Sequence, residues 1–278
     1  MIPFLTIWLG QTVSLLGSNL TNFALGVWVY RRTGMATPFA LTLVCATLPV
    51  VVLAPLAGSL VDRWDRRKVM ILSDAGAGLS TLAVALLILS GRLEVWHVYL
   101  VTAASSSFGA FQWPAYTAAV PRLLPREHLG RGNGLIQLGQ ALSRIAAPAL
   151  AGVLLLAIGL EGVALIDVGT FLFAIATLML IRIPGAAKAG EKAGNAGALH
   201  GDRVGFGYFR ERPGLLALLV FLCVSNFLTG AVSALAPPLV LSSSSPRVLG
   251  TIQTVGGVGM LAGSLVMSAW GGPRRRIL

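Results

Sequence analysis

The sequence predicts an all-α protein that crosses a membrane several times, and three observations support this prediction. The chain is 55% hydrophobic and 11% charged, with a mean hydropathy of +0.81, whereas a soluble domain carries about 25% charged residues. Its charges are clustered, which leaves uncharged gaps as long as the ~20 residues that span a bilayer's hydrocarbon layer. In lipid these uncharged gaps are expected to be helices, because every backbone polar group needs a partner within its own segment. The third observation is that two short motifs recur near the end of the chain.

Eight spans follow from these gaps. The first, residues 4–30, is too long for the apolar region of a signal peptide and has no basic region before it. We therefore interpret it as a membrane helix and not as a cleaved leader. The remaining gaps predict spans at 39–61, 69–90, 95–120, 134–160, 162–182, 214–241 and 248–270.

Basic residues are distributed unevenly between the two sides that these spans define. The loops after spans 2, 4 and 6 and the tail after span 8 carry 16 lysines and arginines, with Arg182 at the very end of span 6 included, against 4 in the other loops. The positive-inside rule then predicts a multi-pass protein of the plasma (inner) membrane, with a cytoplasmic amino terminus. The bilayer is the expected partner. The net charge of +11 does not indicate nucleic acid, which would need a basic patch on a soluble domain.

One long polar segment divides the spans into six and two. It begins with an Ala/Gly-rich stretch typical of a flexible linker. It continues with alternating apolar and basic residues, typical of a short amphipathic helix at the cytoplasmic interface. We expect a six-helix bundle over residues 1–183, the linker over 184–213, and the first two helices of a second bundle over 214–278.

Internal repetition indicates how the two bundles are related. Gly-Ser-Leu-Val occurs at 58–61 and again at 263–266, and a Ser-Asn motif at 18–21 recurs at 225–229. Six spans, a linker and a new copy of spans 1 and 2 form the layout of a transporter with parallel six-helix repeats. The second copy is incomplete, so we expect about eight of twelve transmembrane helices. Spans 7 and 8 are then expected to be loosely held, with the glycines of span 8 lacking a close helix partner.

The loop after span 2 resembles the signature of the major facilitator superfamily; it reads Gly58-Ser59-Leu60-Val61-Asp62-Arg63-Trp64-Asp65-Arg66-Arg67-Lys68. Asp65 replaces the usual second glycine. This variant, together with Trp8-Leu9-Gly10-Gln11 and residues 121–129, is similar to the drug and siderophore exporters called transmembrane secretion effectors. The resemblance implies a secondary active exporter that moves an amphiphilic small molecule, such as a drug or a siderophore, in antiport with protons.

Two alternatives stay open: a passive facilitator or lipid flippase on the same fold, and an inactive truncated membrane fragment. An enzyme is not expected, because the chain shows neither a catalytic constellation nor a phosphate-binding loop. We expect no cofactor and no metal, since the three histidines are scattered. Cys45 and Cys223 lie in spans outside any Cys/His cluster, and we interpret them as packing residues.

The resemblance implies a gating role for six residues of the signature: Gly58, Leu60, Asp62, Arg63, Arg66 and Arg67. In the family this loop latches the two six-helix halves together, with the aspartate facing the positive amino end of a helix in the second half. That helix would be the eleventh, beyond the eight expected here. The alternative is that these charges only fix topology. Gly58 is expected to let span 2 pack closely against a neighbour.

Span 5 resembles a degenerate antiporter signature over residues 143–152. Ser143, Ala147 and Ala151 stand in place of three glycines, and small residues of this kind let helices approach closely. Pro148 and Gly152 form the expected helix-bend motif.

Arg144 and Asp167 are the ionisable residues deepest in the spans. A charge at the centre of a membrane helix is costly unless it faces a cavity or a partner, so a place on the substrate or proton pathway is the default hypothesis. A structural pairing between helices is the alternative. We interpret Asp74, near the start of span 3, as a structural partner of Arg122 or of the arginines in the loop before it.

Uncharged polar residues complete the candidates for that pathway. Asn19 and Asn226 are related by the repeat, which predicts similar depths across the pseudo-axis. Gln112 and Gln140 are further candidates to line a central cavity, together with Gln11, Asn22 and Gln137. Each of these side chains could instead hydrogen-bond between helices.

Overall fold

The computed structural model describes residues 1–181 and 213–270, and these residues form eight α-helices, one short 3₁₀ helix and no strand. The all-α class and the eight expected helices are confirmed in this part of the chain. The linker and amphipathic helix predicted within 184–213 lie outside the described residues. The helices are α1 (Ile2–Thr33), α2 (Ala36–Arg63), α3 (Arg66–Leu89), α4 (Val95–Leu123), η1 (Arg126–His128), α5 (Leu129–Ala157), α6 (Gly159–Leu180), α8 (Pro213–Ser243) and α9 (Pro246–Trp270).

Five helical segments of the described chain are long and apolar enough to cross a membrane by length and composition alone: α2, α3, α5 with η1, α6 and α8. The sequence predicted eight spans, and α1, α4 and α9 are not among these five. At 32 and 29 residues, α1 and α4 would extend about 48 and 43 Å at a rise of 1.5 Å per residue. Both carry polar side chains that face an interior cavity, which lowers their mean hydropathy but not their length.

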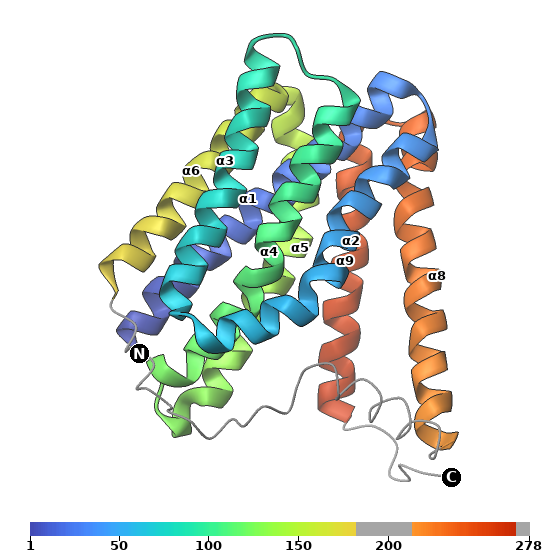
Figure 1. The fold of residues 1–278 in the computed structure, drawn as a ribbon. Helices are drawn as coiled ribbons and strands as arrows, with labels where there is room; N and C mark the ends of the chain where they lie inside the picture. Colours follow the sequence, from blue (N-terminus) through green and yellow to red (C-terminus); the bar gives the residue numbers. More distant parts are fainter. Residues whose placement is uncertain (182–212, 271–278) are drawn as a thin grey trace.

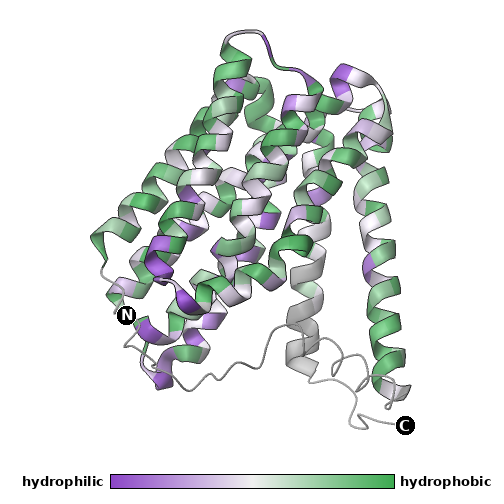
Figure 2. Cartoon of the chain, in the orientation of Figure 1, coloured by the Kyte–Doolittle hydropathy of each residue, from purple (hydrophilic) through white to green (hydrophobic). Residues whose placement is uncertain are grey.

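The first six helices pack into one bundle (Figure 1). α1 lies against α5 and α6, α3 lies against α4 and α6, and α2 runs along α4. The amino terminus and the connections after α2 and α4 lie at one end of this bundle, and the connections after α1, α3 and α5 lie at the other. Figure 2 shows hydrophilic residues gathered at the end that holds the amino terminus. The basic loops after α2 and α4 therefore share one end of the molecule.

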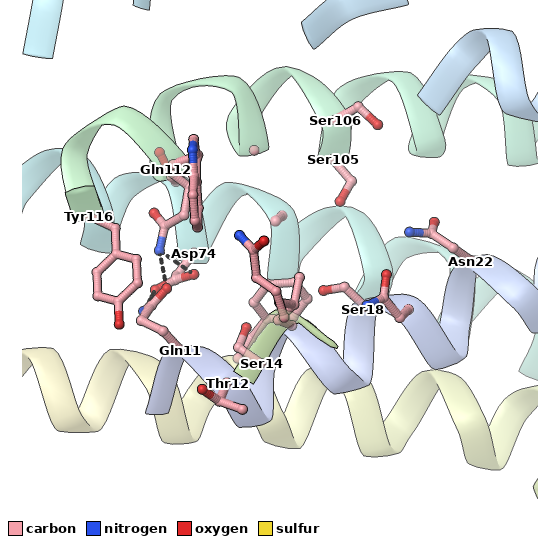
Figure 3. Close-up of a pocket in the computed structure, with 18 of the residues that line it drawn as sticks. Gln11, Thr12, Ser14, Ser18, Asn22, Asp74, Ser105, Ser106, Gln112 and Tyr116 are labelled. Carbon is pink, nitrogen blue, oxygen red and sulfur yellow. Dashed lines mark hydrogen bonds between the residues drawn. The ribbon is translucent and has the colours of Figure 1, made fainter. Parts of the chain in front are cut away.

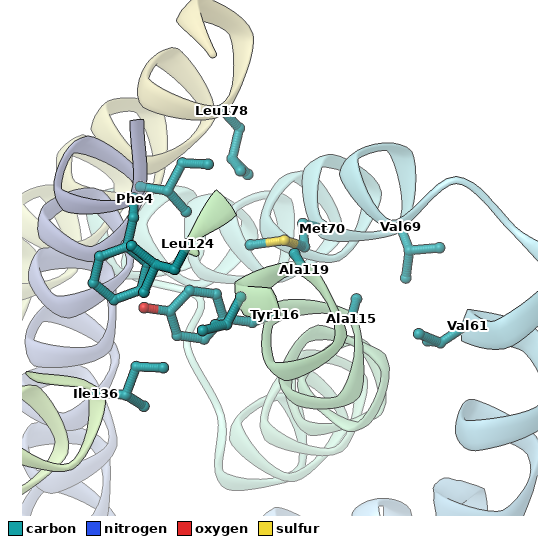
Figure 4. Close-up of a cluster of buried hydrophobic side chains, with 12 residues drawn as sticks. Phe4, Val61, Val69, Met70, Ala115, Tyr116, Ala119, Leu124, Ile136 and Leu178 are labelled. Atoms are coloured by element: carbon teal, nitrogen blue, oxygen red, sulfur yellow. The ribbon is translucent and has the colours of Figure 1, made fainter. Parts of the chain in front are cut away.

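Two apolar clusters fill the bundle on either side of a polar layer. The first, in Figure 4, joins α1, α3, α4, α5 and α6 around Phe4, Met70 and Tyr116. The second lies toward the other end and includes Leu20, Val84 and Val163. Lipid is as apolar as these side chains, so they stabilise the bundle mainly through close packing. Between the two clusters α1 carries the polar residues that build the site.

Close helix contact depends on glycines that face threonines. A Cβ atom on Gly10 would meet Thr177 of α6. A Cβ atom on Gly17 would overlap Thr170 and would come within 2.8 Å of a carboxylate oxygen of Asp167. These two glycines lie one heptad apart and hold one face of α1 against α6.

α9 packs along α5, whereas α8 stands at the edge of the molecule with few contacts (Figure 1). The Thr254 hydroxyl donates a hydrogen bond of 2.9 Å to the carbonyl oxygen of Ile145. A Cβ atom on Gly152 would come within 2.8 Å of the Pro246 carbonyl oxygen, and one on Gly250 would overlap the Pro148 carbonyl. The expectation of a loosely held helix is therefore wrong for the first half of α9, because small residues on both helices let its backbone approach that of α5. The expected lack of a close partner holds for Gly256, Gly259 and Gly263, whereas a Cβ atom on Gly257 would meet Ile145.

Candidate functional site

A cavity of about 270 Å³, here called cavity 1, lies among α1, α3, α4, α5 and α6. Figure 3 shows polar side chains of α1, α3 and α4 converging on it. α1 contributes Gln11, Ser14, Ser18 and Asn22, whose spacing places them on one helix face. Four rings form apolar walls: Trp8, Trp113, Tyr116 and Phe171. Cavity 1 thus combines apolar walls with a few convergent polar groups, the usual make-up of a small-molecule site.

Asp74 is the acidic residue of cavity 1 and is 4% exposed. The Gln11 side-chain amide donates to its Oδ2 at 2.8 Å, and that of Gln112 donates to its Oδ1 at 3.0 Å. Gln112 also donates to Gln11 Oε1 at 2.6 Å, so the three side chains form one network (Figure 3). The interpretation of Asp74 as a partner of Arg122 or the loop arginines is wrong, because its side chain points inward to α1 and α4.

Two buried polar atoms in or next to this network have no hydrogen-bond partner among the described residues, Gln112 Oε1 and the Tyr116 hydroxyl. They lie one turn apart on α4. A buried polar atom left without a partner costs about 1–3 kcal/mol. Both side chains line cavity 1, but these two oxygen atoms are buried, so the side chains must turn before a bound molecule can satisfy them.

Asp167 lies outside cavity 1 and is 1% exposed. It accepts hydrogen bonds from the hydroxyls of Thr81 on α3, at 3.2 Å, and Thr170 on α6, at 3.4 Å. It borders a void of about 20 Å³, cavity 3, which Ser18 and Asn22 also line. Among the described residues its hydrogen-bond partners are the hydroxyls of Thr81, on a neighbouring helix, and of Thr170, on its own helix, and Arg144 is not among them. The structure therefore does not bring the two deep charges together.

Arg144 lines a second cavity of about 330 Å³, here called cavity 2, between the six-helix bundle and α8 with α9. Its side chain is exposed and makes no hydrogen bond or ion pair with any described residue. Neutral hydrogen-bonding side chains also line cavity 2: Asn19, Asn22, Thr42, Thr102, Ser233 and Gln253. Pro148 also lines this cavity, one turn after Arg144 within the continuous helix α5.

The other polar candidates divide between the cavities and the surface. Gln112 and Gln140 line cavity 1, and Asn19 lines both cavities. Asn226 is exposed and donates to the Leu222 carbonyl oxygen of its own helix at 2.8 Å. The repeat-related pair Asn19 and Asn226 therefore does not share a cavity in this structure. Gln137 is exposed.

Comparison with known proteins decides what kind of protein carries this site. Residues 7–278 match the family model described as Major Facilitator Superfamily. The chain belongs to the major facilitator superfamily. It is therefore a multi-pass membrane transporter and not an enzyme.

Exporters are among the relatives of this major facilitator chain. It is 32% identical to macrolide efflux protein A of Streptococcus pyogenes over 100% of the chain and 69% of that protein. Its identity to the multidrug efflux pump Tap of Mycolicibacterium fortuitum is 27%, over 99% of the chain and 70% of Tap. Its identity to the enterobactin exporter EntS of Salmonella typhi is 25%, over 88% of the chain and 55% of EntS. The chain thus spans between about half and 70% of the length of these relatives.

A solved structure shares the fold of this major facilitator chain. It is the crystal structure of a bacterial homologue of the human lysosomal transporter Spinster, in an inward-facing and unoccupied conformation. The match has a TM-score of 0.68 at 14% sequence identity, and covers 97% of this chain and 62% of that one. At this identity the likeness shows the fold alone.

The major facilitator signature lies at the junction of α2 and α3. The Arg67 guanidinium donates hydrogen bonds of 2.8 Å to the carbonyl oxygens of both Leu178 and Met179, at the carboxyl end of α6. Asp65, which replaces the usual glycine, is the N-cap of α3 and accepts from the Arg67 backbone N–H at 2.9 Å. Both contacts lie within the first six helices. They anchor the beginning of α3 to the end of α6.

The remaining signature residues lie at the end of α2 or the start of α3. Nothing lies within 4 Å of a Cβ atom built on Gly58, so the expected close packing of span 2 at this glycine is not found among the described residues. Leu60 is half-buried and Arg63 exposed, and Arg66 is half-buried with a partner. The side chain of Asp62 lies outside the described part of the structure.

Replacing Arg67 with glutamine is expected to destabilise the protein by about 1–3 kcal/mol, because the carbonyl oxygens that end α6 lose a charge-assisted donor. The measurement is thermal unfolding of the purified protein in one detergent, followed by tryptophan fluorescence. The matched control is Arg63→Gln, since the Arg63 side chain is exposed. Equal transition temperatures for the two variants would show that Arg67 does not stabilise the end of α6.

Proposed function

We propose that the chain belongs to a secondary active exporter that moves an amphiphilic small molecule out of the cell in exchange for protons. The observation that carries this proposal is a buried carboxyl group, Asp74, in a cavity that also has aromatic walls. The names of three relatives, a macrolide efflux protein, a multidrug efflux pump and an enterobactin exporter, support the outward direction.

The lining of cavity 1 supports an amphiphilic ligand. Its rings offer apolar area, and its amide, hydroxyl and carboxyl groups offer hydrogen bonds at a few fixed points. If the Tyr116 and Gln112 side chains turn toward the ligand, their unpaired oxygen atoms would orient one of its polar groups while the rings cover its apolar part. Because the lining of cavity 1 offers much apolar area and few ionic contacts, it suits ligands of varied shape.

The surroundings of Asp74 support proton coupling. Both of its hydrogen-bond partners are neutral amides, and the titratable group near it in cavity 1 is Tyr116. A carboxylate without a countercharge is costly at membrane depth, and protonation removes that cost. Proton binding and release at Asp74 would then accompany the movement of one bundle against the other around this site.

Three further roles are part of the proposal. The signature Gly58–Lys68, with Asp62, Arg63 and Arg66, acts as a latch between the halves of the whole transporter. Arg144 acts on the substrate pathway through cavity 2. The amino terminus and the loops after α2 and α4 face the cytoplasm, because these loops carry the excess of basic residues.

Transport in everted membrane vesicles tests the function. Vesicles from cells that produce the transporter would be loaded with protons by respiration and offered a radiolabelled macrolide. The proposal requires accumulation in the lumen that an uncoupler abolishes. Equal entry with and without the pH gradient would instead identify a passive facilitator and would remove proton coupling.

Cysteine labelling of intact cells tests the orientation, in a background in which Cys45 and Cys223 are replaced by alanine. Arg126→Cys, after α4, is expected to react with a membrane-impermeant maleimide only in everted vesicles. Arg92→Cys, after α3, is expected to react in intact cells. The motivation is the bias of basic residues, and the reverse labelling pattern would invert the proposed topology.

A further inference from the structure

Cavities 1 and 2 carry opposite charges. Cavity 1 holds the carboxyl group of Asp74, and its lining contains no lysine, arginine or histidine among the described residues. Cavity 2 holds the guanidinium of Arg144, and its lining contains no aspartate or glutamate in the same part of the chain. A single ligand that touched both cavities would meet a negative group at one end and a positive group at the other.

Neither charge is neutralised by the described protein. Asp74 accepts hydrogen bonds from the amides of Gln11 and Gln112, and Arg144 has no ion pair or hydrogen bond with any described residue. A charge inside a membrane protein is costly unless it has a partner or faces water. The ligand itself can therefore supply both missing countercharges.

The two cavities share a wall. Asn19 and Asn22 of α1 line both of them, so the cavities adjoin along this helix. Gln11, which holds Asp74, and Asn22, which borders the Arg144 cavity, are separated by about 16 Å along α1 at the helical rise per residue. A ligand that spans both cavities must therefore be elongated. Apolar side chains accompany its path, with Trp113 and Phe171 in cavity 1 and Phe23, Phe39 and Leu43 in cavity 2.

We propose that cavities 1 and 2 are two ends of one binding site for an elongated amphiphilic zwitterion, whose ammonium group pairs with Asp74 and whose carboxylate pairs with Arg144. This inference rests on the proposed function, because it names the substrate class of the same transport site. The ammonium group and the proton would compete for Asp74. Binding of the ligand in cavity 1 would then displace the proton from its carboxyl group.

Direct binding to the purified chain of residues 1–278, in nanodiscs of phosphatidylcholine, tests the inference. Radiolabelled ω-aminododecanoate is the probe, since its charges lie at opposite ends of a long alkyl chain. Scintillation proximity is expected to show that Asp74→Asn and Arg144→Gln each weaken its binding about tenfold or more, as for the loss of one partner of a buried charge pair. The short analogue ω-aminohexanoate is expected to compete poorly, because it cannot reach both charges.

Ligands with one charge separate the two ends of the site. Dodecylamine is expected to lose affinity in Asp74→Asn only, and dodecanoate in Arg144→Gln only. Each variant must therefore retain one ligand, which distinguishes a lost contact from a misfolded protein. The matched controls are Asp167→Asn, a buried carboxyl outside both cavities, and Arg131→Gln, an exposed arginine on α5.

Two outcomes would overturn the inference. If only one of the two variants weakened binding of ω-aminododecanoate, the cavities would be separate sites. If neither weakened it, the charges would not bind the ligand. The vesicle experiment is independent of this result: proton-driven macrolide uptake can fail while the binding pattern holds, or succeed while the pattern is absent.

Discussion

Asp74→Asn is expected to abolish proton-driven accumulation of substrate in everted vesicles, reducing it to the level seen with an uncoupler. Asparagine has nearly the same shape and can keep a hydrogen bond with Gln11 or Gln112, but it cannot bind and release a proton. Downhill movement of substrate should persist in this variant at saturating substrate, because the rings of cavity 1 are unchanged, although the lost carboxylate is expected to raise the substrate concentration needed. The measurement is initial uptake with and without the pH gradient, at matched amounts of protein in the membrane.

Asp167→Asn is the matched control for this prediction. Asp167 is as deeply buried as Asp74, but it accepts from threonine hydroxyls and lies outside cavity 1. The control is expected to keep uncoupler-sensitive accumulation. The opposite pattern, with accumulation lost in Asp167→Asn and kept in Asp74→Asn, would contradict the prediction and would identify Asp167 as the proton site.

Gly250→Val is expected to separate α9 from α5. A Cβ atom at this position would overlap the Pro148 carbonyl and lie 3.0 Å from its carbon. Backbone of a continuous helix cannot move aside as a flexible side chain can, so the two helices must part. Overpacking of this kind costs about 1–3 kcal/mol, and sometimes more.

Cross-linking between the two helices measures this separation. In a background in which Cys45 and Cys223 are replaced by alanine, cysteines at Ile145 and Gly257 are expected to form a disulfide readily, because a Cβ atom built on Gly257 lies 3.4 Å from the Cβ atom of Ile145. Gly250→Val should lower the yield severalfold. Gly256→Val on the same helix is the control, since nothing lies within 4 Å of its Cβ position. An equal yield in both variants would show that Gly250 does not set the helix distance.

The number and extent of the helices could be predicted from the sequence, because a backbone segment in lipid must form its own hydrogen bonds and therefore folds as a helix. The uncharged run 4–30 became α1, Ile2–Thr33, and the run 248–270 became α9, Pro246–Trp270. Charged residues mark the ends of such runs, and α1 ends just after Arg31 and Arg32. Neither inference needs knowledge of the neighbouring helices.

The partners of each helix could not be predicted in this way. Apolar residues face both lipid and the bundle interior, so composition does not give the rotation of a helix about its axis. Asp74 was therefore assigned to arginines near it in sequence, whereas its partners lie on α1 and α4. For the same reason the sequence repeat that pairs Asn19 with Asn226 did not indicate that Asn226 is exposed.

Comparing how far each polar residue lies from the end of its helix would have predicted the network of Asp74, Gln11 and Gln112. Gln11 and Asp74 lie about 13 and 12 Å from the beginnings of α1 and α3, and Gln112 lies about 16 Å from the end of α4, at the helical rise per residue. These three helix ends share one side of the bundle. Polar residues at similar depth on helices that alternate in direction are thus a usable signal. The contact of α9 with α5 has no comparable signal, because it depends on glycines whose partner lies on a distant helix.

The division of α1 into two faces has a consequence for how this lineage would adapt to new compounds. Gly10 and Gly17 face α6 and tolerate little change, whereas Asn22 borders all three cavities. A single nucleotide change in the Asn22 codon would alter the surroundings of both charged sites without touching the glycine face. Under selection by an unfamiliar toxic molecule, we expect adaptive mutations to accumulate first in the codons of this one helix face.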